Sequence, residues 1–230
     1  MGTGNVHKLE ALGLIVGPVL ALLFFLLEPG GILIDPVEPG DAVGGITALA
    51  SNSALAHASS LLVPLSLLLM LFGLVGISRV TSGEQMSGGL SRLGILCMTI
   101  GGAGWILSAG LTHVLTETVM ESDLALQQAI AVYRVDSGLT IISSMVVSAG
   151  VLAFSLGVSA MSPGGVGRTV ALVVSAVSAI ALITLIIGHT GPNPDMIRVA
   201  RACYFPWAAW IAYLGVRFLK GSGLPQTAGN

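Results

Sequence analysis

Charged residues are scarce in this chain. Lys, Arg, Asp and Glu make up 9% of its 230 residues, against roughly a quarter in an ordinary soluble domain. Hydrophobic residues make up 54%, far more than a soluble globule needs for its core. Lys and Arg number 9, Asp and Glu number 11, and the net charge is -2. Since nucleic-acid binding shows as a basic excess, the composition gives no support for a nucleic-acid partner.

Cysteines and catalytic motifs are equally sparse. The two cysteines, Cys97 and Cys203, are too few for a disulfide framework, and both fall in apolar stretches. We expect them to be separate buried thiols. The chain contains no P-loop, no G-x-S-x-G elbow, no H-E-x-x-H and no paired-cysteine metal motif. The sequence therefore leaves open whether the protein is an enzyme.

Long apolar runs are what the sequence has instead. A helix needs about 20 mostly apolar residues to cross a bilayer, and continuous runs of that length favour helices over barrel strands. The pattern predicts an all-α fold, a polytopic bundle of six transmembrane helices that forms a single transmembrane domain over residues 1–230. The predicted spans are about 9–27, 55–78, 90–115, 137–161, 169–188 and 202–219. We expect a multi-pass protein of the cell membrane, with the lipid bilayer as its surroundings.

The first apolar run also has features of a signal peptide, because His7 and Lys8 precede it. Its length, from Leu9 to Leu27, exceeds the usual apolar region of about 7 to 15 residues. It ends in Glu28-Pro29-Gly30-Gly31, without a small-x-small cleavage pattern. A retained span is the better interpretation.

The basic residues predict the orientation, because cytoplasmic loops are enriched in Lys and Arg. One side of the six-span arrangement collects Lys8, Arg79, Arg92, Arg168, Arg217 and Lys220, and the other holds Arg134, Arg198 and Arg201. Nine of the eleven acids lie on the second side. The first side is therefore predicted to be cytoplasmic, with both termini inside (N-in/C-in), and the outer surface is expected to be acidic.

Small residues recur at four-residue intervals in the spans, as at Gly13 and Gly17 and at Ala171 and Ser175. This spacing places them on one face of a helix and allows close helix packing in lipid.

Histidine is the main indication of chemistry. His57 opens the second span, His113 nearly closes the third and His189 follows the fifth, so the topology places all three at the outer boundary. Imidazole is a common ligand of zinc, copper and iron, and three such ligands with an open position form a catalytic type of metal site. Glu117 follows His113 by four residues and shares its helix face. We therefore predict a metal site of His57, His113, His189 and Glu117.

Three other interpretations of the histidines stay open at this point, and one of them is proton or ion handling. Two imidazoles at one depth on different helices can be the opposed axial ligands of a haem. Histidines at a membrane boundary also serve as simple amphipathic anchors with no ligand at all.

The sequence thus supports three functional classes. The first is a membrane protein that binds a metal ion or haem at an outer histidine cluster. The second is a transporter of small solutes or ions, favoured by the acidic outer face. The third is a noncatalytic accessory or assembly subunit of a membrane complex, favoured by short loops, with other membrane proteins or further copies of the chain as partners.

Overall fold

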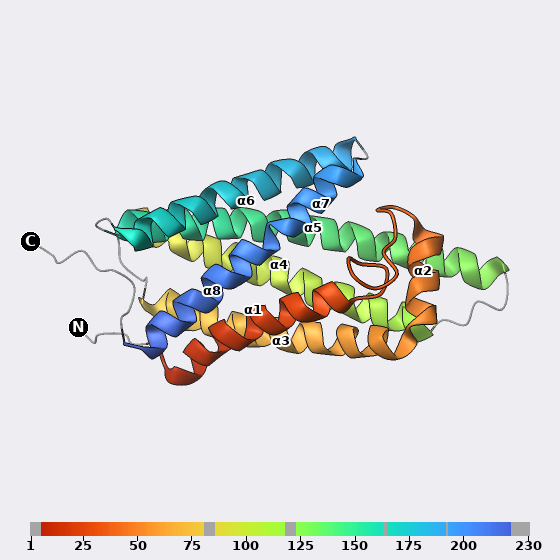
Figure 1. Cartoon of the computed structure of the whole chain (residues 1–230), viewed down its shortest axis with the longest axis horizontal. Coiled ribbons are helices and arrows are strands. Elements are labelled where there is room, and N and C mark those ends of the chain that lie inside the picture. The colour runs from red at the N-terminus through yellow and green to blue at the C-terminus, as the bar shows by residue number, and fades with distance from the viewer. Residues whose placement is uncertain (1–5, 81–85, 118–122, 163–164, 192, 222–230) are drawn as a thin grey trace, which may run out of the picture.

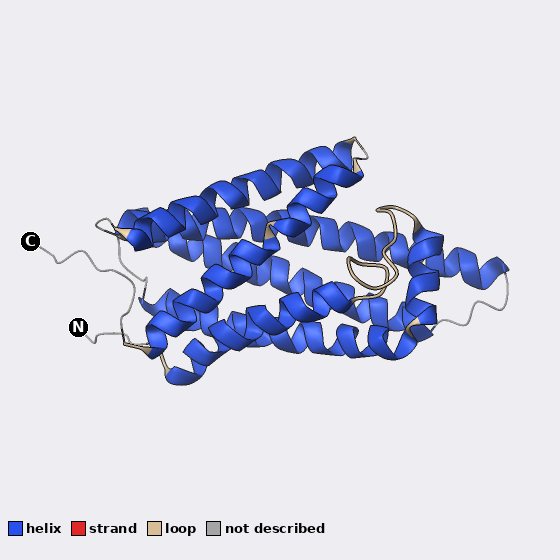
Figure 2. Ribbon diagram, in the orientation of Figure 1, coloured by secondary structure: helices blue, strands red, loops and turns tan. Residues whose placement is uncertain are grey.

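The computed structural model describes residues 6–80, 86–117, 123–162, 165–191 and 193–221. Within these ranges the chain forms helices and no strands (Figure 2). The helices are α1 (Lys8–Leu27), α2 (Ala42–Ser51), α3 (Ser53–Val80), α4 (Met86–Glu117), α5 (Asp123–Met161), α6 (Val166–Thr190), α7 (Pro194–Ala202) and α8 (Tyr204–Leu219).

Five helices of the described part are long and apolar enough to cross a membrane: α1, α3, α4, α5 and α6. They run along the long axis of the molecule, while the short α2 lies across one end of the bundle (Figure 1). The first five predicted spans fall within these helices. Two of these helices extend beyond the predicted spans, because α4 continues to Glu117 and α5 already begins at Asp123.

The sixth predicted span, residues 202–219, differs from the structure in length. Only α8 lies there, and its 16 residues reach about 24 Å, short of the roughly 30 Å hydrocarbon core. The helix is interrupted at Cys203, and α7 precedes the interruption as a separate helix. Pro206 is a physical reason for this, because its ring nitrogen cannot donate to the carbonyl of Ala202.

Small residues allow the helices to pack closely. A Cβ atom added to Gly17 of α1 would lie 2.5 Å from the backbone nitrogen of Met70 in α3, so only glycine fits there. On α6, Ala171 and Ser175 are buried, and the hydroxyl of Ser175 lies 2.8 Å from that of Ser155 in α5. The predicted packing role of these small residues is confirmed.

An ion pair between a buried carboxylate and a half-exposed arginine joins α1 to α3 at the end of the bundle opposite α2. Glu10 of α1 is 3% exposed, and its carboxylate pairs with the guanidinium of Arg79 in α3. The same carboxylate accepts a hydrogen bond of 2.9 Å from the backbone N–H of His7. The acid is thus fully partnered, as a charge inside an apolar bundle requires. Cys97 and Cys203 are separate free thiols, as predicted, but only Cys203 is buried and Cys97 is partly exposed.

The outer surfaces of the long helices are apolar. Leu107, Ile142 and Ile183, on α4, α5 and α6, are each more than half exposed. Water would make such surfaces costly, since apolar area in water is unfavourable by roughly 25 cal/mol per Å². Lipid chains cover them without that cost.

Candidate functional site

The first turns of α3 and the last turns of α4 are held together by a small apolar cluster beside α2. Ile46 and Leu49 of α2 pack with Ala56 of α3, Leu115 of α4 and Ala129 of α5. Ala56 directly precedes His57, and Leu115 lies two residues after His113. The cluster therefore determines how the two histidines face each other.

The two imidazoles are in direct contact. The Nδ1 atoms of His57 and His113 lie 3.2 Å apart, and the rings meet edge to face with centroids 4.8 Å apart. Glu117 approaches from the other side, with its Oε1 atom 3.5 Å from Nε2 of His113. The hydroxyl of Ser60 lies 3.2 Å from Nδ1 of His113. Both histidines are partly exposed.

This arrangement is suited to binding a metal ion. A carboxylate beside Nε2 favours the tautomer that carries its proton there, which leaves the lone pair of His113 on Nδ1. Two nitrogens bound at about 2.05 Å in tetrahedral geometry lie about 3.4 Å apart, and the observed Nδ1 to Nδ1 distance is 3.2 Å. One ligand atom each from His57, His113 and Glu117 can be chosen so that all lie within 4.8 Å of one another.

His189 does not belong to this group. It lies in the last turn of α6, which packs mainly against α5 and α7. Figure 1 shows α6 and α3 on opposite sides of the bundle. Equal depth in the membrane was the basis for including His189, but depth does not determine the direction around the bundle axis.

A second polar group lies between α4 and α5 and is missing from the sequence interpretation. The carboxylate of Asp136 on α5 accepts a hydrogen bond from Ser108 of α4, and the hydroxyl of Thr112 lies 3.5 Å from it. Thr140 completes the group, 2.7 Å from Ser108. A pattern in the sequence could have indicated this group. Two successive helices each carry a pair of polar residues four positions apart, Ser108 with Thr112 and Asp136 with Thr140.

Glu28 and Arg201 add charge beside this group. Glu28 directly follows α1 and lies outside the spanning helices. Burial, and after it the negative charge of Asp136, raises the pKa of the Glu28 carboxyl from 4.5 to about 7, while the positive charge of Arg201 lowers it. These surroundings therefore favour the protonated form of Glu28 more than water does.

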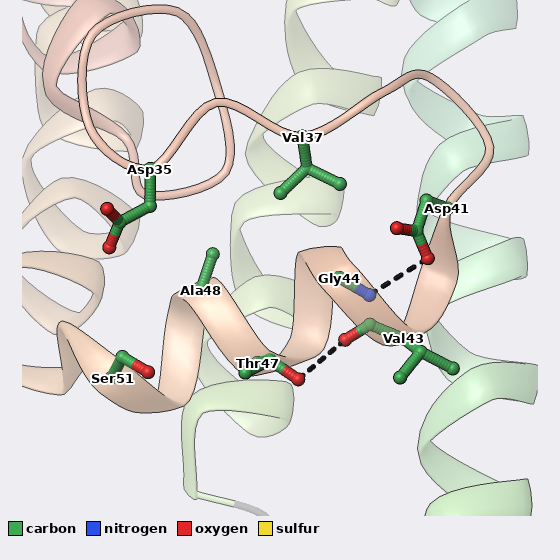
Figure 3. Close-up of a pocket in the computed structure, with 8 residues that line it drawn as sticks. All are labelled: Asp35, Val37, Asp41, Val43, Gly44, Thr47, Ala48 and Ser51. Carbon is green, nitrogen blue, oxygen red and sulfur yellow. Dashed lines mark hydrogen bonds between the residues drawn. The ribbon is translucent and has the colours of Figure 1, made fainter.

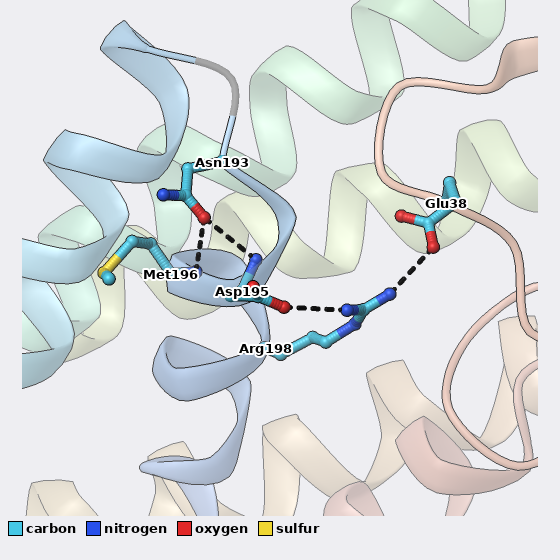
Figure 4. A network of polar contacts seen from close by, with 5 residues as sticks. All are labelled: Glu38, Asn193, Asp195, Met196 and Arg198. Carbon is cyan, nitrogen blue, oxygen red and sulfur yellow. Dashed lines mark hydrogen bonds and ion pairs between the residues drawn. The ribbon is translucent and has the colours of Figure 1, made fainter.

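Two cavities flank the loop that joins α1 to α2. The first, of about 500 Å³, lies between the loop and α2 (Figure 3). Its acids have structural roles, because Asp41 accepts from the N–H of Gly44 at the start of α2 and Asp35 accepts from Asn52. The second cavity, of about 470 Å³, lies between the loop and the junction of α7 with α8. Arg198 bridges Asp195 of α7 and Glu38 of the loop beside it (Figure 4).

The fold defines the class of protein. In the part of the chain that the structure describes, the fold is all-helical and five apolar helices have membrane-spanning length, which makes the chain a multi-pass integral membrane protein. Comparisons with family models, curated proteins and solved structures find no match.

Proposed function

We propose that this protein binds one transition-metal ion, Zn²⁺ or Cu²⁺, at the end of the bundle covered by α2. His57 and His113 are the ligands through their Nδ1 atoms, and Glu117 holds the Nε2 proton of His113. The observation that carries the proposal is the 3.2 Å separation of the two Nδ1 atoms, close to the ligand spacing of a tetrahedral ion. Nitrogen ligands without thiolates suit zinc and Cu(II).

A single ion fits this geometry better than a haem. Opposed axial ligands lie on the two faces of a porphyrin, so the macrocycle must pass between the imidazoles. The rings of His57 and His113 are in edge-to-face contact, which leaves no space for it. Two protein nitrogens also leave coordination positions open for water or a solute, as in a site that activates water or transfers its ion.

A metal titration tests the proposal. Protein purified in detergent, stripped with a chelator and titrated with Zn²⁺ or Cu²⁺ is expected to bind one ion per chain. The readouts are elemental analysis after gel filtration and, for Cu²⁺, an absorption or paramagnetic resonance spectrum typical of nitrogen ligation. A protein that elutes free of metal at saturating ion concentrations would exclude the proposal.

We further propose that α7 and α8 together complete a sixth crossing of the membrane. In this proposal the protein lies in the cell membrane and both of its termini face the cytoplasm. The bias of Lys and Arg supports this orientation, and α8 returns toward the end of the bundle where α1 begins (Figure 1).

Labelling of single cysteines tests this topology. In a background without Cys97 and Cys203, Ser51→Cys at the end of α2 is expected to react with a membrane-impermeant maleimide from outside intact cells. Ser87→Cys at the start of α4 is expected to react only after the membrane is opened. Reaction of both from the same side would contradict the proposed orientation.

A transporter of small solutes or ions is the second candidate function. The observation that favours it is Asp136, an acid that is hydrogen-bonded inside the bundle with Glu28 and Arg201 nearby. Ionisable groups at such positions often mark ion and proton pathways. The metal titration separates the two candidates, because this second function does not require an ion at His57 and His113.

A further inference from the structure

The cavity at the junction of α7 and α8 has the properties of a binding site for an amphiphilic anion. Two arginines, Arg198 and Arg201, line it together with apolar side chains that include Ile32, Val37 and Phe205. Apolar walls with a few convergent polar groups are typical of ligand sites. Its volume of about 470 Å³ is large enough for a headgroup.

The two arginines have different roles. Arg198 is fully engaged, since its guanidinium pairs with Asp195 and with Glu38 at 2.8 Å each (Figure 4). It holds the loop against α7 and so forms one wall of the cavity. Arg201 is partly buried, and no carboxylate among the described residues lies within ion-pair distance of it. A cation in that situation can receive an anionic ligand.

The neighbouring acids leave the charge of Arg201 available. Glu38 and Asp195 are already paired with Arg198. Glu28 is the acid whose charge Arg201 influences, and burial raises the pKa of that carboxyl. Its surroundings therefore favour the protonated form more than those of an ordinary glutamate do.

If α7 and α8 complete the proposed sixth crossing, the cavity lies at the depth of the headgroup region of a bilayer. The 16 residues of α8 place its first turn about 24 Å from its far end, near one face of a hydrocarbon core about 30 Å thick. Arg201 lies three residues before α8, where phosphates are found. Ala202 and Phe205 are exposed on the side that continues toward the lipid chains, and Phe205 is 43% exposed.

From these observations we infer that the cavity binds the phosphate of a phospholipid from the leaflet on the α2 side. Arg201 binds the phosphate oxygens, which its planar guanidinium can contact in pairs. The acyl chains leave the cavity past Phe205. This site is separate from the histidine pair, and its test does not depend on a bound metal ion.

Native mass spectrometry in an uncharged detergent tests the inference, with phosphatidylglycerol as the probe. Arg201→Gln is expected to lower lipid occupancy about tenfold or more, because a charge-assisted hydrogen bond is lost. Arg134→Gln is the matched control: it removes the same charge from an exposed position on α5 and is expected to leave occupancy unchanged. Equal losses in the two variants would overturn the inference.

Two further arms identify the ligand. Diacylglycerol, which lacks the phosphate, is expected not to bind, and binding equal to that of phosphatidylglycerol would overturn the role of Arg201. Millimolar inorganic phosphate is expected not to displace the lipid, and full displacement would assign the site to free phosphate instead. If Arg201→Gln does not fold, Arg201→Lys decides: it keeps the charge but loses the paired contact, so unchanged occupancy would overturn the inference.

Discussion

His113→Ala is expected to lower the affinity for Zn²⁺ by at least about 100-fold. Loss of a residue that only hydrogen-bonds to a metal ligand costs up to about 100-fold, and loss of the ligand itself should cost at least as much. The substitution removes one of the two imidazole ligands and also the group that Glu117 contacts. Competition with a chromophoric chelator measures the change in affinity. Glu117→Gln is expected to cost less, about tenfold, because the amide still occupies the position but orients the imidazole poorly.

His189→Ala is the control for this prediction. It also removes an imidazole near the end of a long helix, but from the last turn of α6, outside the group of His57, His113 and Glu117. Its metal affinity is expected to equal that of the unmodified protein. A loss as large as that of His113→Ala would mean that the ion is not held by the facing pair, and the proposed site would be wrong.

Gly94→Ala is expected to lower the free energy of unfolding by about 2 kcal/mol, within the usual cost of overpacking a core. Gly94 lies where α4 crosses α5. A Cβ atom there would contact the backbone nitrogen of Phe154 and lie 2.6 Å from the carbonyl oxygen of Gly150. Since both contacts involve backbone atoms, the helices must separate to accept the methyl group. Unfolding in detergent with increasing denaturant measures the change.

Gly110→Ala, on the same helix, is the matched control. A Cβ atom at Gly110 meets nothing within 4 Å, so the substitution only raises helix propensity, by up to about 1 kcal/mol. The two variants are therefore expected to change stability in opposite directions. If Gly94→Ala is as stable as Gly110→Ala, the close crossing of α4 and α5 is not as the structure has it.

The sequence determined the class of protein and most of its helices. Long apolar runs such as 55–78 and 169–188 indicate segments that cross a bilayer. In lipid, a single segment can form all of its backbone hydrogen bonds only as a helix, so these runs predict helices without knowledge of the fold. The spacing of His113 and Glu117 likewise predicts their contact, because residues four apart share a helix face.

Only the tertiary structure decided which side chains from different helices meet. His57, His113 and His189 have similar expected depths, but depth says nothing of the direction around the bundle axis, and α6 carries His189 away from α3. The interruption at Cys203 and the burial of Asp136 against Ser108 were beyond the sequence interpretation for the same reason. Hydropathy predicts only how deep a residue lies along the membrane normal. A site between helices also depends on how each helix is rotated and where it crosses its neighbours. Close packing at residues such as Gly94 determines that rotation and crossing.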